Sequence, residues 1–148
     1  GTTIELPEGT AVLVDYSAGG RISTGLVYRS WPYLSTDAGQ RVDLSRFPGA
    51  QAGVAVMLFT GRLADGRVTL RQPDGAAVTI SWDAAQIPYL GLWINAGAWP
   101  SPDTPIAHIG LEPCTGYPDR LDRALQHGGC LRLGPREVRR WWFSLQFT

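Results

Sequence analysis

The chain has 148 residues, of which 44% are hydrophobic and 18% are charged, a balance that excludes a disordered chain. Thirteen acidic residues offset thirteen basic ones, so no net charge favours nucleic acid or an anionic membrane surface as a partner. No apolar run reaches the ~20 residues that a membrane-spanning helix needs. We therefore expect a single folded domain over residues 1–148.

The first half of the chain predicts strands separated by turn residues. Thr10–Tyr16 is the first of them, and Val54–Phe59 is a continuous apolar run, typical of a strand buried on both faces. Arg67–Arg71 and Val78–Trp82 alternate between apolar and polar residues around a Pro-Asp-Gly turn. This pair predicts an antiparallel hairpin with one face in solvent.

Three further strands are predicted at Tyr89–Asn95, Ile106–Glu112 and Val138–Phe147. The one helical segment is short, Asp119–Gln126, and its two leucines lie four residues apart, so that they could dock on a sheet. No segment repeats at a fixed period. The pattern indicates an all-β fold, an antiparallel β-sandwich.

Aromatic residues are numerous, with six Trp, five Tyr and four Phe, and they concentrate between residues 82 and 147. In the last predicted strand, alternation places four large apolar side chains on one face: Trp141, Phe143, Leu145 and Phe147. Such residues either line a ligand groove or contact another polypeptide segment. A sheet that lacks a neighbouring strand also exposes an edge that invites pairing. We therefore expect a large apolar face that meets a second segment.

The strand at Tyr89–Asn95 places its three aliphatic side chains on one face. The other face carries Tyr89, Gly91, Trp93 and Asn95. Aromatic rings stack on the apolar faces of sugar rings while amides bind hydroxyl groups, so Trp93 and Asn95 are candidate sugar contacts. The alternative is a second hydrophobic layer.

The next strand places His108, Gly110 and Glu112 on one face. A carboxylate at the end of an apolar strand is costly to bury unless it is paired or used, and Pro113 ends the regular ladder directly after it. We interpret Glu112 as the centre of a functional site, half-buried beside Trp93 on a concave surface. The alternative for Glu112 is a solvated acid at the end of a strand. His108 is a further candidate substrate contact, and its alternative is a structural role.

The two cysteines, Cys114 and Cys130, form neither a disulfide framework nor a metal site. No secretion signal is visible, so we expect free thiols and a cytoplasmic protein. A bridge between the two is the alternative. The two His and two Cys lack ligand spacing, so we expect no metal and no cofactor.

Three segments, in this order, carry a resemblance to a known family. They are Gly91–Asn95, Gly110–Asp119, and Leu133–Pro135 leading into Arg140–Trp142. Their order and spacing resemble the C-terminal end of the galactose mutarotase-like family, the aldose 1-epimerases and their relatives. The resemblance covers roughly residues 85–147.

The resemblance implies a β-supersandwich that binds a monosaccharide or sugar derivative in a cleft. It implies that Glu112 is the general base that takes the proton of the anomeric hydroxyl, so that the ring opens and recloses as the other anomer. In the family, a histidine from the N-terminal half protonates the ring oxygen, and neither His108 nor His127 occupies a matching position. Because the family's domain is about twice this length, residues 1–148 correspond to its C-terminal part. The expected partner is then the N-terminal half of the same protein or a second chain.

Three functions remain open at this point. The first is an aldose 1-epimerase-like isomerase with Glu112 as base. The second is a non-catalytic carbohydrate-binding β-sandwich that keeps the cleft but lacks the acid. The third is a structural sandwich whose aromatic residues pair with another chain.

Overall fold

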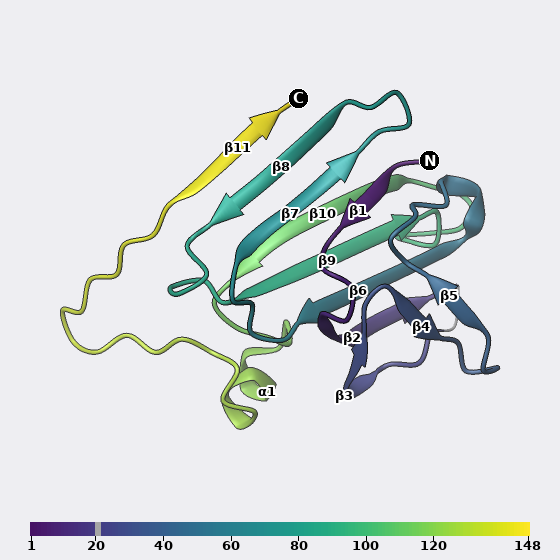
Figure 1. Ribbon diagram of the computed structural model, residues 1–148. Helices are drawn as coiled ribbons and strands as arrows, with labels where there is room; N and C mark the ends of the chain where they lie inside the picture. The colour runs from purple at the N-terminus through teal and green to yellow at the C-terminus, as the bar shows by residue number, and fades with distance from the viewer. Residues whose placement is uncertain (20–21) are drawn as a thin grey trace.

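The computed structural model describes residues 1–19 and 22–148, and it consists of two antiparallel sheets packed face to face (Figure 1). This confirms the predicted all-β sandwich. The four-stranded sheet has the order β1 (Thr3–Glu5), β7 (Gly66–Arg71), β8 (Ala77–Trp82) and β11 (Phe143–Phe147). The five-stranded sheet has the order β10 (Ala107–Cys114), β9 (Tyr89–Ala96), β6 (Val54–Thr60), β2 (Ala11–Ala18) and β3 (Gly25–Ser30).

The remaining elements are small. A two-stranded sheet pairs β4 (Tyr33–Ser35) with β5 (Arg41–Asp43). A 3-10 turn covers Ala50–Ala52, and the one α-helix among the described residues, α1, covers Leu121–Gln126.

The two most regular sequence patterns form the elements they predict. The apolar run β6 lies in the middle of the five-stranded sheet, and all of its residues after Val54 are buried. Strands β7 and β8 form the expected hairpin, with Val68 opposite Ile80 on the inner face. On the outer face the hydroxyl groups of Thr69 and Thr79 are hydrogen-bonded at 2.8 Å.

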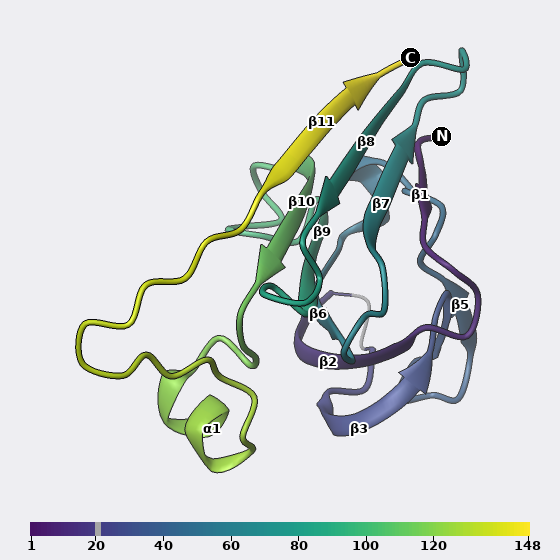
Figure 2. The ribbon, with the colours of Figure 1, turned by 60° about the vertical axis from the view of Figure 1, so that its left-hand side comes forward.

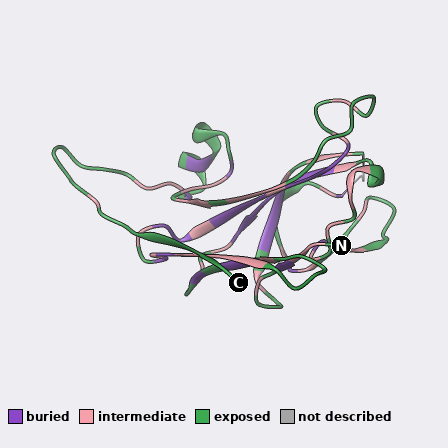
Figure 3. Cartoon of the chain, turned by 90° about the horizontal axis from the view of Figure 1, so that it is seen from above, coloured by how far each residue is buried: buried purple, intermediate pink, exposed green. Residues whose placement is uncertain are grey.

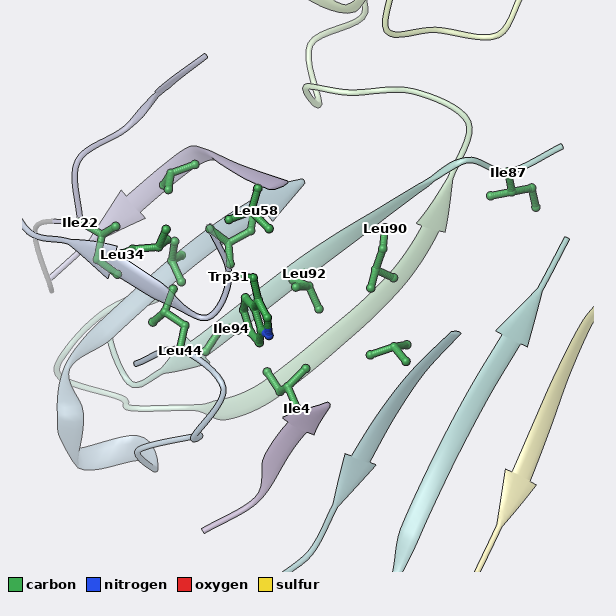
Figure 4. Packing of buried hydrophobic residues seen from close by; sticks show 14 of the residues in the cluster. Ile4, Ile22, Trp31, Leu34, Leu44, Leu58, Ile87, Leu90, Leu92 and Ile94 are labelled. Carbon is green, nitrogen blue, oxygen red and sulfur yellow. The ribbon is translucent and has the colours of Figure 1, made fainter. Parts of the chain in front are cut away.

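The core lies between the two sheets and extends under the small β4–β5 sheet (Figure 4). Trp31 lies among aliphatic side chains with only 2% of its surface exposed. Trp82, at the end of β8, is equally buried, and its Nε1 donates a hydrogen bond to the Ile87 carbonyl at 2.8 Å. Each buried aliphatic side chain contributes about 1.5–3 kcal/mol, so this layer holds the sheets together.

Helix α1 begins two residues later than predicted and docks differently. Ala124 is its buried residue, whereas Leu121 and Leu125 are exposed. The reason is that the helix has fewer than two turns and stands beside the five-stranded sheet rather than on it (Figure 2). The expectation that the two leucines dock the helix on a sheet was therefore wrong.

Strand β11 is shorter than the predicted Val138–Phe147 because its neighbour β8 ends at Trp82, which pairs with Phe143. Residues before Phe143 have no strand beside them, and the chain from α1 runs outside both sheets to reach this edge (Figure 2). All five residues of β11 are exposed (Figure 3). The expected apolar face is thus present along β11.

Candidate functional site

The candidate site lies on the outer face of the five-stranded sheet, which is turned away from the core. The strand registers align two rungs of residues across β10, β9, β6 and β2. The first rung is Glu112, Gly91, Phe59 and Leu13, and the second is Gly110, Trp93, Met57 and Tyr16. Each rung contains one glycine, so Glu112 and Trp93 lie on a diagonal of the sheet whose other two corners are Gly91 and Gly110.

The Glu112 carboxylate leans over one of these glycines. A Cβ placed on Gly110 would lie 2.8 Å from Glu112 Oε1 and 3.2 Å from Trp93 Cβ. A Cβ on Gly91 would lie 3.3 Å from Glu112 Cβ and 2.9 Å from Met57 Cε. Gly110 therefore leaves the space in which the carboxylate lies beside Trp93, whereas the space over Gly91 is filled by Met57 and Phe59.

Glu112 shares its face with Trp93, as expected, but it is exposed rather than half-buried. The reason is that β10 is the edge strand of its sheet, so the side chain is covered from one side only. Burial against the sheet nevertheless raises the pKa of the Glu112 carboxyl, and the nearby Asp119 charge raises it further.

Two other carboxylates lie in a chain with Glu112: Asp119 is close to Glu112, and Asp15 is close to Asp119. Burial raises the pKa of Asp119, and the charge of Asp15 adds to this effect. Among the described residues, none of the three carboxylates forms an ion pair or accepts a side-chain hydrogen bond. They are therefore free to accept hydrogen bonds from hydroxyl groups of a ligand.

Trp93 is the centre of an aromatic group beside Glu112. Its ring lies 6.0 Å from that of Tyr16 and 6.0 Å from that of Trp99, which it meets edge-on. Its Nε1 donates a 2.7 Å hydrogen bond to His108 Nε2. His108 is exposed on the same face, and accepting this bond requires its Nε2 to be unprotonated.

Asn95 is placed differently from the expected sugar contact. It is completely buried, and its Nδ2 donates to the Trp99 carbonyl at 2.8 Å. Its Oδ1 accepts from the backbone N–H groups of Trp99 at 3.2 Å and Gly97 at 3.3 Å. Asn95 thus shapes the turn that carries Trp99, and it presents no surface to a ligand.

A pocket of about 310 Å³ opens on the opposite side of Glu112 from Trp93. Its wall includes Glu112, Cys114, Pro118 and Asp119, together with residues of α1. Trp93 does not line it, so Glu112 and Trp93 do not share this pocket. Glu112 instead stands between an aromatic surface and a pocket whose size suits a small ligand.

Three tyrosines border the site toward β3, and none of them was predicted as a site residue. The hydroxyl groups of Tyr28 and Tyr117 are hydrogen-bonded, and Tyr117 meets the ring of Tyr89 edge-on at 4.7 Å. Burial, followed by the hydrogen bond to Tyr117, raises the pKa of Tyr28 well above its ordinary value. In the sequence, only the position of Tyr117, directly before the Pro118-Asp119 pair of the segment that carries the family resemblance, pointed to one of these tyrosines.

A larger pocket, of about 670 Å³, lies away from Glu112, on the outer face of the four-stranded sheet. It is lined by polar side chains such as Arg67, Thr69 and Gln146. Arg71, which also lines it, is paired with Glu5 at 2.6 Å. These residues have the alternation of a solvated sheet face, and they include none of the candidate residues.

Comparisons with protein families, with curated proteins and with solved structures found no match to this chain. In residues 1–19 and 22–148, no three His, Cys, Asp or Glu side chains are grouped so that they could hold a metal ion. No helix in the described part of the chain is long and apolar enough to cross a membrane.

Cys114 and Cys130 are both free thiols, as predicted.

Proposed function

We propose that this chain binds a monosaccharide or sugar derivative on the outer face of the five-stranded sheet, with Glu112 as the general base of an aldose 1-epimerase-like reaction. The observation that carries the proposal is the position of the Glu112 carboxylate, which lies over Gly110 beside Trp93. A half-buried aromatic ring next to unpaired carboxylates suits a pyranose, whose C–H faces are apolar and whose rim carries hydroxyl groups.

The proposed reaction is a proton transfer followed by ring opening. The Glu112 carboxylate takes the proton of the anomeric hydroxyl, the C1–O1 bond becomes a carbonyl, and the C1–O5 bond breaks. O5 receives a proton from a general acid, and the reverse steps on the other carbonyl face give the other anomer. A raised Glu112 pKa strengthens this carboxylate as a base at neutral pH.

The general acid of this proposal comes from outside the matched segments, as the resemblance implies. His108 Nε2 already accepts the Trp93 Nε1 hydrogen bond, so that nitrogen carries no proton to donate. The second candidate function follows from this observation. It is a non-catalytic carbohydrate-binding sandwich that uses the same surface.

We place the protein in the cytoplasm, whether it is the enzyme or the non-catalytic module, in keeping with the two free thiols.

Proton NMR of α-glucose and α-galactose mutarotation tests the catalytic form of the proposal. Wild type should accelerate the interconversion, and Glu112→Gln should slow it by about two to four orders of magnitude, as expected for a positioned base. Glu8→Gln, an exposed change outside the site, is the matched control and should keep the wild-type rate.

Quenching of tryptophan fluorescence by the same sugars tests the binding form. Binding without acceleration would favour the non-catalytic module. An absence of both binding and acceleration would refute the proposal, as would wild-type rates in Glu112→Gln.

A further inference from the structure

The outer edge of β11 has backbone N–H and C=O groups that form no hydrogen bond with the described part of the chain. Strand β11 is last in the four-stranded sheet and pairs with β8 alone. Thr148 and Ala77 exchange two backbone hydrogen bonds, of 2.8 and 3.0 Å, and so form a hydrogen-bonded pair. Such pairs alternate along an antiparallel ladder. The N–H and C=O groups of Phe143, Leu145 and Phe147 therefore point away from β8, toward the open edge.

The side chains of these three residues are apolar and exposed. The exposed fractions are 65% for Phe143, 51% for Leu145 and 74% for Phe147. They project on the inner side of the sheet, where Phe143 and Leu145 line a groove of about 290 Å³ with Leu111 and Pro113 of β10. Unused backbone groups and uncovered apolar side chains thus belong to the same residues.

Residues 141–148 lack the sequence features that usually prevent an edge strand from pairing with another chain. Exposed edge strands in natural proteins usually carry charged residues, proline or a bulge that prevents association. Residues 141–148 contain no charged residue and no proline, and the pairing of β11 with β8 has no register shift.

We propose that a second copy of this chain pairs with β11, edge to edge and antiparallel, about a two-fold axis at Leu145. A two-fold interface requires a surface that is complementary to itself, and β11 meets this requirement. With Leu145 opposite Leu145 of the other copy, Phe143 of each copy lies opposite Phe147 of the other. The N–H and C=O groups that point away from β8 then face one another in all three residue pairs, and each pair exchanges two hydrogen bonds.

The exposed area bounds the size of this interface. The four aromatic side chains of the segment, Trp141, Trp142, Phe143 and Phe147, are 56–74% exposed. With about 150–250 Å² for each aromatic side chain, they offer about 500 Å² per copy. Two copies offer about 1,000 Å², at the lower end of the range for specific interfaces. The dimer is therefore reversible, with a dissociation constant in the micromolar range, on the order of 1–100 μM.

Sedimentation velocity between about 1 and 300 μM tests this proposal with charge variants of one residue. Leu145→Lys and Leu145→Glu each place two like charges directly opposite across the axis, which destabilises pairing. Each variant alone should weaken the dimer by at least about tenfold. An equimolar mixture of the two should restore it, because Lys then faces Glu.

Val138→Lys is the matched control, since Val138 is 75% exposed but precedes β11. It should dimerise as wild type does. Circular dichroism checks that each variant is folded. A wild type that stays monomeric at all concentrations, whether or not another polypeptide segment covers β11, would overturn the proposal. Dimerisation of either charge variant at wild-type strength would do the same.

Discussion

Gly110→Ala separates the geometry of the site from the stability of the fold. The new Cβ would lie 2.8 Å from Glu112 Oε1, closer than any ordinary contact, so the carboxylate must move. It is the far end of a flexible side chain, and moving it costs the fold little. The other close contact, 3.2 Å to Trp93 Cβ, requires a shift of a few tenths of an ångström.

The expected change in stability is small because two effects oppose each other. Replacing glycine by alanine restricts the unfolded chain and stabilises by about 0.4–1 kcal/mol. Crowding against Trp93 offsets part or all of that gain. The melting temperature should therefore change by no more than about 4 °C, since 1 kcal/mol corresponds to about 2–4 °C at this size.

The expected change in sugar binding is larger. A displaced Glu112 carboxylate loses a charged hydrogen bond to the ligand, worth about 1.5–3 kcal/mol. Affinity measured by tryptophan fluorescence should fall about 10- to 100-fold. Gly134→Ala is the matched control, because its Cβ would meet only Glu137 Oε2 at 3.5 Å, an ordinary contact. A Gly110→Ala protein with wild-type stability and wild-type affinity would refute the placement of the site over Gly110.

Three further predictions concern stability, pH and the thiols. Asn95→Ala should lower the free energy of unfolding by about 2–4 kcal/mol in urea titrations, because buried backbone groups of the following turn lose their partner. The pKa values of Glu112 and Asp119 are raised in the folded state. Above about pH 4 the native protein therefore binds more protons than the unfolded chain does. As a result, these two groups lower the stability as the pH rises through their folded pKa values. Glu112→Gln and Asp119→Asn should therefore each raise the melting temperature at pH 7 more than at pH 4, and an equal effect at both values would contradict this reasoning. Titration of the unfolded chain without reductant should find two reactive thiols, Cys114 and Cys130. In the folded protein Cys114 should react slowly, because burial raises its pKa to about 11.

The sequence by itself determined the strands that alternate or that are apolar throughout. Those patterns located β2, β6 and β7 to β10 within a few residues, because side chains of period two must choose between core and solvent. The same alternation placed His108, Gly110 and Glu112 together on one face of β10. The three-residue strands β1, β4 and β5 were not predicted, since so short a segment carries no period. Strand β1, for example, is defined by its pairing with β7, in which Ile4 lies opposite Leu70.

Only the tertiary structure decided how the site is assembled and which residues remain available to a ligand. The register of β9 against β10 sets Trp93 beside Gly110, and the fold brings Asp119 close to Glu112 and Asp15 close to Asp119. Asn95 looked like a ligand contact, but the turn after β9 surrounds its amide. A strand pattern gives the face on which a side chain lies. Whether that side chain is covered depends on residues distant in sequence, and so does the edge that β11 leaves open.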